Sequence, residues 1–128
     1  MTVQTDSFPF VWMNFNEALD HDHDDELADF DRLLEHGARF VILTEDPPQK
    51  DHDHSHEEKK RMAVWIKKRR SLLKELVAAM VVVEQNSLKR IAIKSFSPGF
   101  QALWGYPIVA AVSREEALII ASELLNPR

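Results

Sequence analysis

The sequence contains no cysteine, and its only glycines are Gly37, Gly99 and Gly105. Without cysteine the chain offers no disulfide, no thiolate metal ligand and no thiol nucleophile, a composition typical of reducing compartments. The glycines do not stand at G-x-G spacing, and no serine occupies a nucleophile elbow, so the usual phosphate-binding and acyl-transfer motifs are missing. We therefore expect a protein that is not an enzyme and requires no cofactor.

Long apolar runs are missing as well. No stretch approaches the ~20 apolar residues of a membrane-spanning helix. Residues 1–15 hold no basic segment ahead of an apolar one, which disfavours a secretory signal. The net charge of −5 disfavours general nucleic-acid binding. We expect a cytoplasmic protein with neither a membrane nor a nucleic acid as its partner.

The composition that remains is that of one ordinary globular domain. The chain has 128 residues, of which 45% are apolar and 29% charged, and a chain of this size can bury one real core. We expect a single domain over residues 1–128.

Four apolar segments predict strands, at residues 8–15, 40–43, 77–83 and 107–112. The second and third do not alternate with polar residues, which is typical of strands covered on both faces. Pro9 lies near the start of the first segment and favours an edge position in the sheet.

Helices are predicted between and after these strands. Residues 26–36 and 56–76 carry apolar residues at three- and four-residue steps. Gly37 stands where a C-cap glycine belongs. The predicted buried stripes are Leu27, Phe30, Leu33 and Leu34 on the first helix, and Met62, Trp65, Ile66, Leu72, Leu73 and Leu76 on the second, where Arg69 interrupts the stripe.

The C-terminal part is predicted to hold two further helices. Asn86 is suited to cap a third, shorter helix that carries Leu88 and Ile91, and Ser97-Pro98-Gly99 is expected to break the chain before an aromatic connection over 100–106. Ser113 and Glu116 have the spacing of a capping box for the last helix, with Ala117, Ile120, Ala121 and Leu124 inward. The alternating order predicts an α/β fold with a four- to five-stranded, mainly parallel sheet.

The pattern resembles the STAS family, and most of all its bacterial SpoIIAA-like branch. The resemblance rests on residues 24–27, 33–37, 39–44, 63–66, 106–109 and 113–117. It implies a small non-enzymatic domain that binds protein partners, sometimes switched by phosphorylation at the N-terminus of the helix after the central strand. The matching position is Ser55, flanked here by His54 and His56. Ser55 is also suited to be a plain N-cap, paired with Glu58.

Two copies of one tetrapeptide are the other candidate site. Asp20-His21-Asp22-His23 and Asp51-His52-Asp53-His54 each follow a predicted strand and precede a predicted helix. Loops after parallel strands leave the sheet at one edge, so neighbouring strands would bring these loops together. The candidate ligands of a divalent ion such as Zn²⁺ or Ni²⁺ are His21, His23, His52, His54 and His56. The alternative interpretation makes residues 45–56 a solvated, polar, His- and Asp-rich loop or a disordered segment.

Charge is distributed unevenly along the chain. The second predicted helix holds eight of the sixteen Lys and Arg residues, whereas residues 17–31 carry eight acidic residues and no Lys or Arg. This pattern indicates a solvated helix face, or a docking surface for an acidic partner or for the acidic segment of a second copy. The aromatic residues Phe96, Phe100, Trp104 and Tyr106 are expected in the core, or alternatively in a dimer or partner patch.

The sequence thus predicts a STAS-like regulatory domain that acts through protein–protein interaction, with a homodimer as one form of it. The alternative function is a metal-binding or metal-sensing accessory protein that uses the two Asp-His-Asp-His segments.

Overall fold

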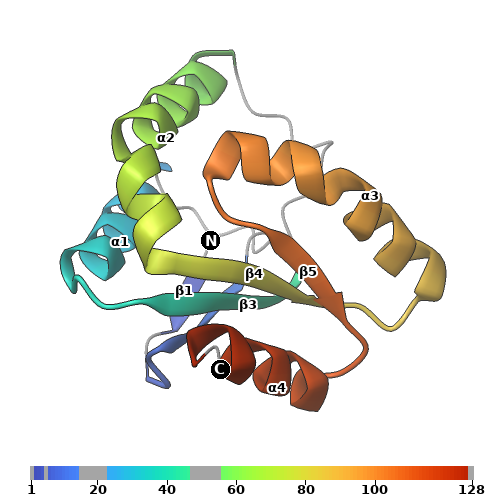
Figure 1. Cartoon of the computed structure of the whole chain (residues 1–128). Helices are drawn as coiled ribbons and strands as arrows, with labels where there is room; N and C mark the ends of the chain where they lie inside the picture. Colours follow the sequence, from blue (N-terminus) through green and yellow to red (C-terminus); the bar gives the residue numbers. More distant parts are fainter. Residues whose placement is uncertain (1, 5, 15–22, 47–55, 127–128) are drawn as a thin grey trace.

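The computed structural model describes residues 2–4, 6–14, 23–46 and 56–126 (Figure 1). Its elements, in chain order, are β1 Thr2–Gln4, β2 Phe10–Asn14, α1 His23–Glu35, β3 Phe40–Asp46, α2 His56–Leu76, β4 Val77–Val83, α3 Ser87–Trp104, β5 Ile108–Ala111 and α4 Arg114–Leu125. The α/β alternation is therefore confirmed. None of the described helices is long and apolar enough to cross a membrane.

The strands form one sheet in the order of the sequence, β1-β2-β3-β4-β5. Strands β2 to β5 pair in parallel and match the four predicted segments, while β1 pairs antiparallel with β2. The predicted edge position of the first apolar segment is wrong, because β1 covers the outer side of β2. Pro9 directly precedes β2 and joins the pairing with β3 through its carbonyl, which accepts from Val41 N–H at 2.9 Å, so its missing N–H does not disturb the pairing.

The two faces of the sheet carry different helices (Figure 1). Helices α1, α2 and α3 lie on one face, where Ile42, Met80 and Val82 point, and α4 covers the other face, where Leu43 and Val81 point. Successive side chains of a strand point to opposite faces. Covering both faces therefore requires an unbroken apolar run, which is the pattern of β4 and of residues 40–43 of β3.

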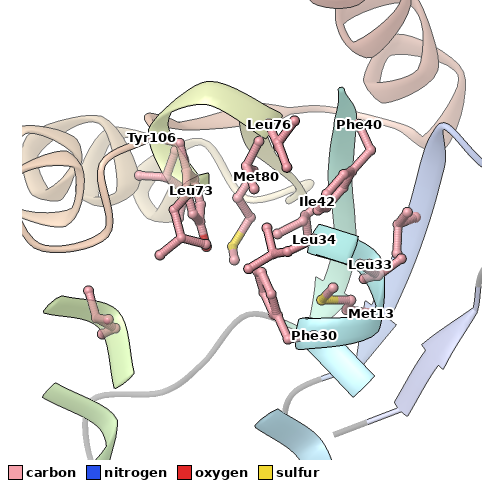
Figure 2. Close-up of a cluster of buried hydrophobic side chains, with 14 of the residues drawn as sticks. Met13, Phe30, Leu33, Leu34, Phe40, Ile42, Leu73, Leu76, Met80 and Tyr106 are labelled. Atoms are coloured by element: carbon pink, nitrogen blue, oxygen red, sulfur yellow. The ribbon is translucent and has the colours of Figure 1, made fainter. Parts of the chain in front are cut away.

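Helices α1 and α2 pack through Trp65, which is 7% exposed. Phe30 lies edge-on to its indole at 5.3 Å, and Figure 2 shows Phe30 beside Leu34 in the core cluster under the helices. Arg69, which interrupts the apolar stripe, stacks on Trp65 at 4.9 Å and forms an ion pair with Asp31 of α1. Arg69 therefore interrupts the apolar stripe because it connects the two helices.

The prediction of a buried stripe on α2 is wrong for one residue, Leu72. Leu72 is 45% exposed, whereas the next residue, Leu73, is completely buried under the sheet-facing side of the helix. Successive helical residues are about 100° apart, so with Leu73 directed inward Leu72 turns towards solvent. The side chains of Leu27 and Met62, and the predicted capping box of Ser55 with Glu58, lie outside the described residues.

The predicted break at residues 97–99 is also wrong, since α3 continues through Pro98 to Trp104 and is not a short helix. Proline removes the hydrogen bond to the carbonyl four residues earlier, that of exposed Lys94, which water can satisfy. Extending the helix places Phe100 in the core, stacked on Trp104 at a centroid distance of 6.0 Å. Tertiary packing thus outweighs the local breaker. The helix ends at Gly105, whose φ of 92° lies in the left-handed region.

The loop after the second predicted strand begins later than expected. Strand β3 runs to Asp46, so Thr44 and Glu45 belong to the strand, and Thr44 is fully buried opposite Val82 of β4. Glu45 also pairs with Arg114 of α4 at 3.1 Å. The boundary of 45 for the His- and Asp-rich segment is therefore wrong; its remaining residues 47–55 lie outside the described part.

The predicted helix ends agree with local hydrogen bonds. The Asn86 side chain accepts from the backbone N–H groups of Leu88 and Lys89, and Ser113 Oγ accepts from Glu116 N–H at 3.1 Å. Gly37 adopts a φ of 67°, and its N–H donates to the Leu34 carbonyl. These caps confirm where α3 and α4 begin and where α1 ends.

Tyr106 gives the first testable prediction. It is the single tyrosine of the chain, it is 1% exposed, and burial raises the pKa of its phenol above the ordinary value of 10. In the unfolded chain the phenol ionises near pH ~10. Above that pH the unfolded state binds fewer protons than the folded state, so the free energy of unfolding falls by up to about 1.4 kcal/mol per pH unit. Below pH ~10 the phenol is protonated in both the folded and the unfolded state, so its ionisation does not lower the free energy of unfolding.

An alkaline titration followed by near-ultraviolet tyrosinate absorbance and far-ultraviolet circular dichroism tests this. Tyrosinate absorbance should appear together with the loss of helical signal. Ionisation near the ordinary pKa in a protein that keeps its circular dichroism would contradict the burial of Tyr106.

Candidate functional site

The carboxyl ends of β2 and β3 lie side by side, as the metal hypothesis requires. The two strands are parallel neighbours, and Asn14, at the end of β2, is opposite Asp46, at the end of β3. The strand ends that precede the two segments therefore lie next to each other at the same edge of the sheet. This confirms the topological part of the hypothesis.

The ligands themselves are not placed by the structure. His21, His52, His54 and Ser55 lie outside the described residues, and His23 and His56 are described only as the first backbone positions of α1 and α2. Within the described residues, no group of three or more His, Asp or Glu side chains could hold a metal ion.

Helix α2 presents an exposed basic face. The exposed cations are Lys60, Arg61, Lys67, Lys68, Arg70 and Lys74. Within the described residues, the predicted match between this helix and the acidic segment includes the Asp31–Arg69 ion pair. Arg70 donates to the Ala102 carbonyl of α3 at 2.8 Å. Part of the basic face therefore connects α2 with its neighbouring helices, and Lys60, Lys67, Lys68 and Lys74 are exposed beside it.

Helix α3 is apolar on two sides. Its inner side packs Ile93, Phe100 and Trp104 against the core. We define its outer face as Leu88, Ile91, Phe96 and Leu103. At about 100° per residue these four positions lie on one side of the helix, and their side chains are between 50% and 75% exposed. A helix with one buried stripe normally turns polar residues outward. Several large exposed apolar side chains on one helix are typical of an interaction surface.

The charge around this outer face has one sign. Helix α3 carries Lys89, Arg90 and Lys94 and no acidic residue. Over residues 56–104 the sequence holds eleven of the sixteen Lys and Arg residues but only four of the twenty-one Asp and Glu residues. A partner that covers the outer face of α3 therefore meets a positive surface, which favours an acidic partner over a second copy of the same face.

A groove of about 620 Å³ lies between the N-terminal half of α3 and strand β5. Arg90, Ile91, Lys94 and Ser97 line one side, and residues 108–110 of β5 line the other. Ser97 Oγ donates to the Ile108 carbonyl at 2.9 Å and holds helix and strand together at that point. The groove combines an apolar side chain, two cations and the backbone of an edge strand.

Sequence reasoning missed both features of α3. The predicted break at Pro98 divided the outer face between a short helix and a connection, so its spacing did not appear as one stripe. The aromatic cluster was foreseen more accurately: Phe100 and Tyr106 are buried in the core, while Phe96 is half exposed on the outer face. The exposed Phe96 corresponds to the alternative interpretation, a partner patch.

Comparison of the chain with models of protein families, with curated proteins and with solved structures finds no match. The fold class is thus defined by the structure, and the resemblance to the STAS family rests on the sequence pattern alone.

Proposed function

We propose that this chain is a small, non-enzymatic regulatory domain that acts by binding a protein partner, as its STAS-like pattern implies. The observation that carries the proposal is the outer face of α3, with Leu88 and Ile91 75% and 61% exposed beside Arg90 and Lys94. Exposed apolar side chains cost free energy in water and are relieved when a partner covers them. The surrounding cations select a partner of opposite charge.

Comparative capture from the source cells tests this proposal. The double variant Leu88→Gln, Phe96→Gln should reduce recovery of the partner about tenfold or more, because central apolar contacts dominate interface energies. Both side chains are largely exposed, so the free energy of unfolding should change by less than about 1 kcal/mol.

The matched control is Ile119→Gln on α4, which is 60% exposed on the opposite side of the sheet and should leave recovery unchanged. Equal recovery by the wild type and the α3 variant would contradict the proposal. Sedimentation of both proteins tells a foreign partner from self-association, which the same variant would also weaken if the outer face formed a homodimer.

A second function is favoured by a separate observation. The pairing of Asn14 with Asp46 puts the ends of β2 and β3, the strands that precede the two Asp-His-Asp-His segments, side by side at one sheet edge. On this basis we propose, as the alternative, a metal-binding or metal-sensing accessory protein. Its ligands would come from His21 or His23 together with His52, His54 or His56, and a borderline ion such as Zn²⁺ or Ni²⁺ suits imidazole and carboxylate donors.

A further inference from the structure

We infer that the groove between α3 and β5 binds an extended, acidic peptide segment of the partner, which adds as a strand to the free edge of β5. The inference rests on the proposed function, a domain that binds protein partners, and names the form and chemistry of the segment that is bound. It concerns the groove of Arg90, Ile91, Lys94, Ser97, Ile108 and Ala110, not the outer face of α3 as a whole.

The edge of β5 has an open position at Ala110. Strand β5 is last in the sheet, and the carbonyls of Pro107 and Ala111 accept from Met80 N–H and Glu84 N–H of the β4 side, at 2.9 and 2.8 Å. Backbone groups of a parallel strand alternate in direction. Residues 107, 109 and 111 therefore face β4, and the N–H and C=O groups of Ile108 and Ala110 face the groove.

The two outward positions differ in their present partners. The Ile108 carbonyl already accepts from Ser97 Oγ, whereas nothing among the described residues bonds to Ala110 on that side. An added strand can pair with Ala110 through one N–H and one C=O, the mode in which extended peptides bind free sheet edges. Ser97 closes one end of the groove, so the peptide extends from Ala110 past the N-terminal end of α3.

Two cations set the charge of this peptide. Arg90 Nη1 donates to the carbonyls of Glu84 and Gln85 at 2.9 and 2.8 Å, which fixes the guanidinium at the groove wall. Lys94 lies one helical turn further and is exposed. Every second side chain of an added strand points towards α3. Carboxylates there meet Arg90 and Lys94, and an apolar side chain meets Ile91.

The same cations disfavour a second copy of this chain as the occupant. Pairing of two β5 edges would bring Arg90 and Lys94 of one copy towards those of the other. Like charges across a strand pair are destabilising, and basic side chains on edge strands prevent such pairing. An acidic strand is the occupant whose charge complements the groove.

The test starts from a displayed library of random peptides selected on the immobilised full chain. We expect the enriched peptides to carry both Asp or Glu and an apolar residue at every second position, the positions that face α3, with no fixed preference at the positions between them. A labelled synthetic copy of one such peptide, followed by fluorescence anisotropy, should bind the Lys94→Glu variant about tenfold or more weakly. The matched variant Lys89→Glu, on the same helix but outside the groove lining, should bind within about twofold of the wild type.

A backbone change tests the strand pairing. Ala110→Pro removes the outward N–H while leaving the bonds to β4, and should abolish binding. If that variant does not fold, the peptide supplies the equivalent change: methylation of the backbone nitrogen opposite Ala110 should abolish binding to the wild type. Amide resonances of residues 108–110 should shift when the unmethylated peptide binds.

Other outcomes overturn the inference. Equal loss in the Lys89→Glu and Lys94→Glu variants would show a diffuse charge effect, and indifference to backbone methylation would exclude strand addition. Peptides that lose affinity only in the Leu88→Gln, Phe96→Gln variant would move binding to the outer face of α3, so that the inference fails and the proposed function stands. If no peptide is selected and the α3 variant also leaves partner capture unchanged, both fail.

Discussion

Replacing Trp65 with alanine is expected to lower the free energy of unfolding by about 3–5 kcal/mol. The indole is 7% exposed and is the largest side chain between α1 and α2. Its removal leaves a cavity against Phe30, which lies 5.3 Å from it, and this region cannot collapse without moving a helix. For a domain of this size such a loss is a large fraction of the total stability.

The partners of Trp65 add to this effect. Its Nε1 donates to Asp31 at 3.4 Å, and the Arg69 guanidinium stacks on its ring. Arg69 also reaches Asp31 through Nη2, so the three side chains form one network across the two helices. Members of such a network do not act independently. We therefore expect Trp65→Ala and Asp31→Ala together to cost less than the sum of the single changes.

Urea unfolding followed by circular dichroism measures the change. The matched control is Leu72→Ala, on the same helix seven residues further but 45% exposed, which should cost about 1 kcal/mol or less. A loss at Trp65 no larger than the loss at Leu72 would contradict the packing of α1 on α2 through this residue.

The contrast between Trp65 and Leu72 also shows which parts of the fold can be predicted from sequence. Strand β4 and residues 40–43 of β3 were predictable because a strand segment covered on both faces must be apolar at every position, as residues 77–83 are. The cap at Asn86 was predictable because its side chain acts on the next turn of the chain. These features depend on local chemistry.

Features that depend on the rest of the fold were not predictable. Pro98 is a helix breaker by its own chemistry, and only the core that Phe100 enters makes a continuous helix favourable. Leu72 has the spacing of a buried residue, and its exposure follows from where the helix meets the sheet. The groove at Ala110 has no sequence signal, because the direction of a backbone N–H depends on the pairing of β5 with β4.

The same distinction applies to the candidate sites. The proposal that the two Asp-His-Asp-His segments converge depends on the assumption that the first two parallel strands are neighbours, and the pairing of β2 with β3 confirms that assumption. The outer face of α3 can be recognised only when the helix is taken at its full length, and the predicted break at Pro98 divided that length in two. The strand order that the metal proposal requires was therefore foreseen, and the outer face of α3, which follows from packing, was not.

The second large effect is expected in a zinc titration of the intact protein. If the two segments share one ion, calorimetry should show one tight site. That site should disappear in the variant His52→Ala, His54→Ala and also in the variant His21→Ala, His23→Ala. Metal binding requires neutral imidazole, whose ordinary pKa is about 6.5, so the affinity should fall as the pH drops through that value.

The double loss is the diagnostic result, because strands β2 and β3 are neighbours and an extended segment directs alternate side chains to opposite sides, so each segment is expected to give two of the about four ligands of a closed zinc site. The control is an equimolar pair of free peptides with the sequences of the two segments, which lack the fixed sheet edge. Loss in only one double variant would mean that the segments act separately. Binding no tighter than that of the free peptides would exclude the metal function and leave protein binding at α3 as the function of this domain.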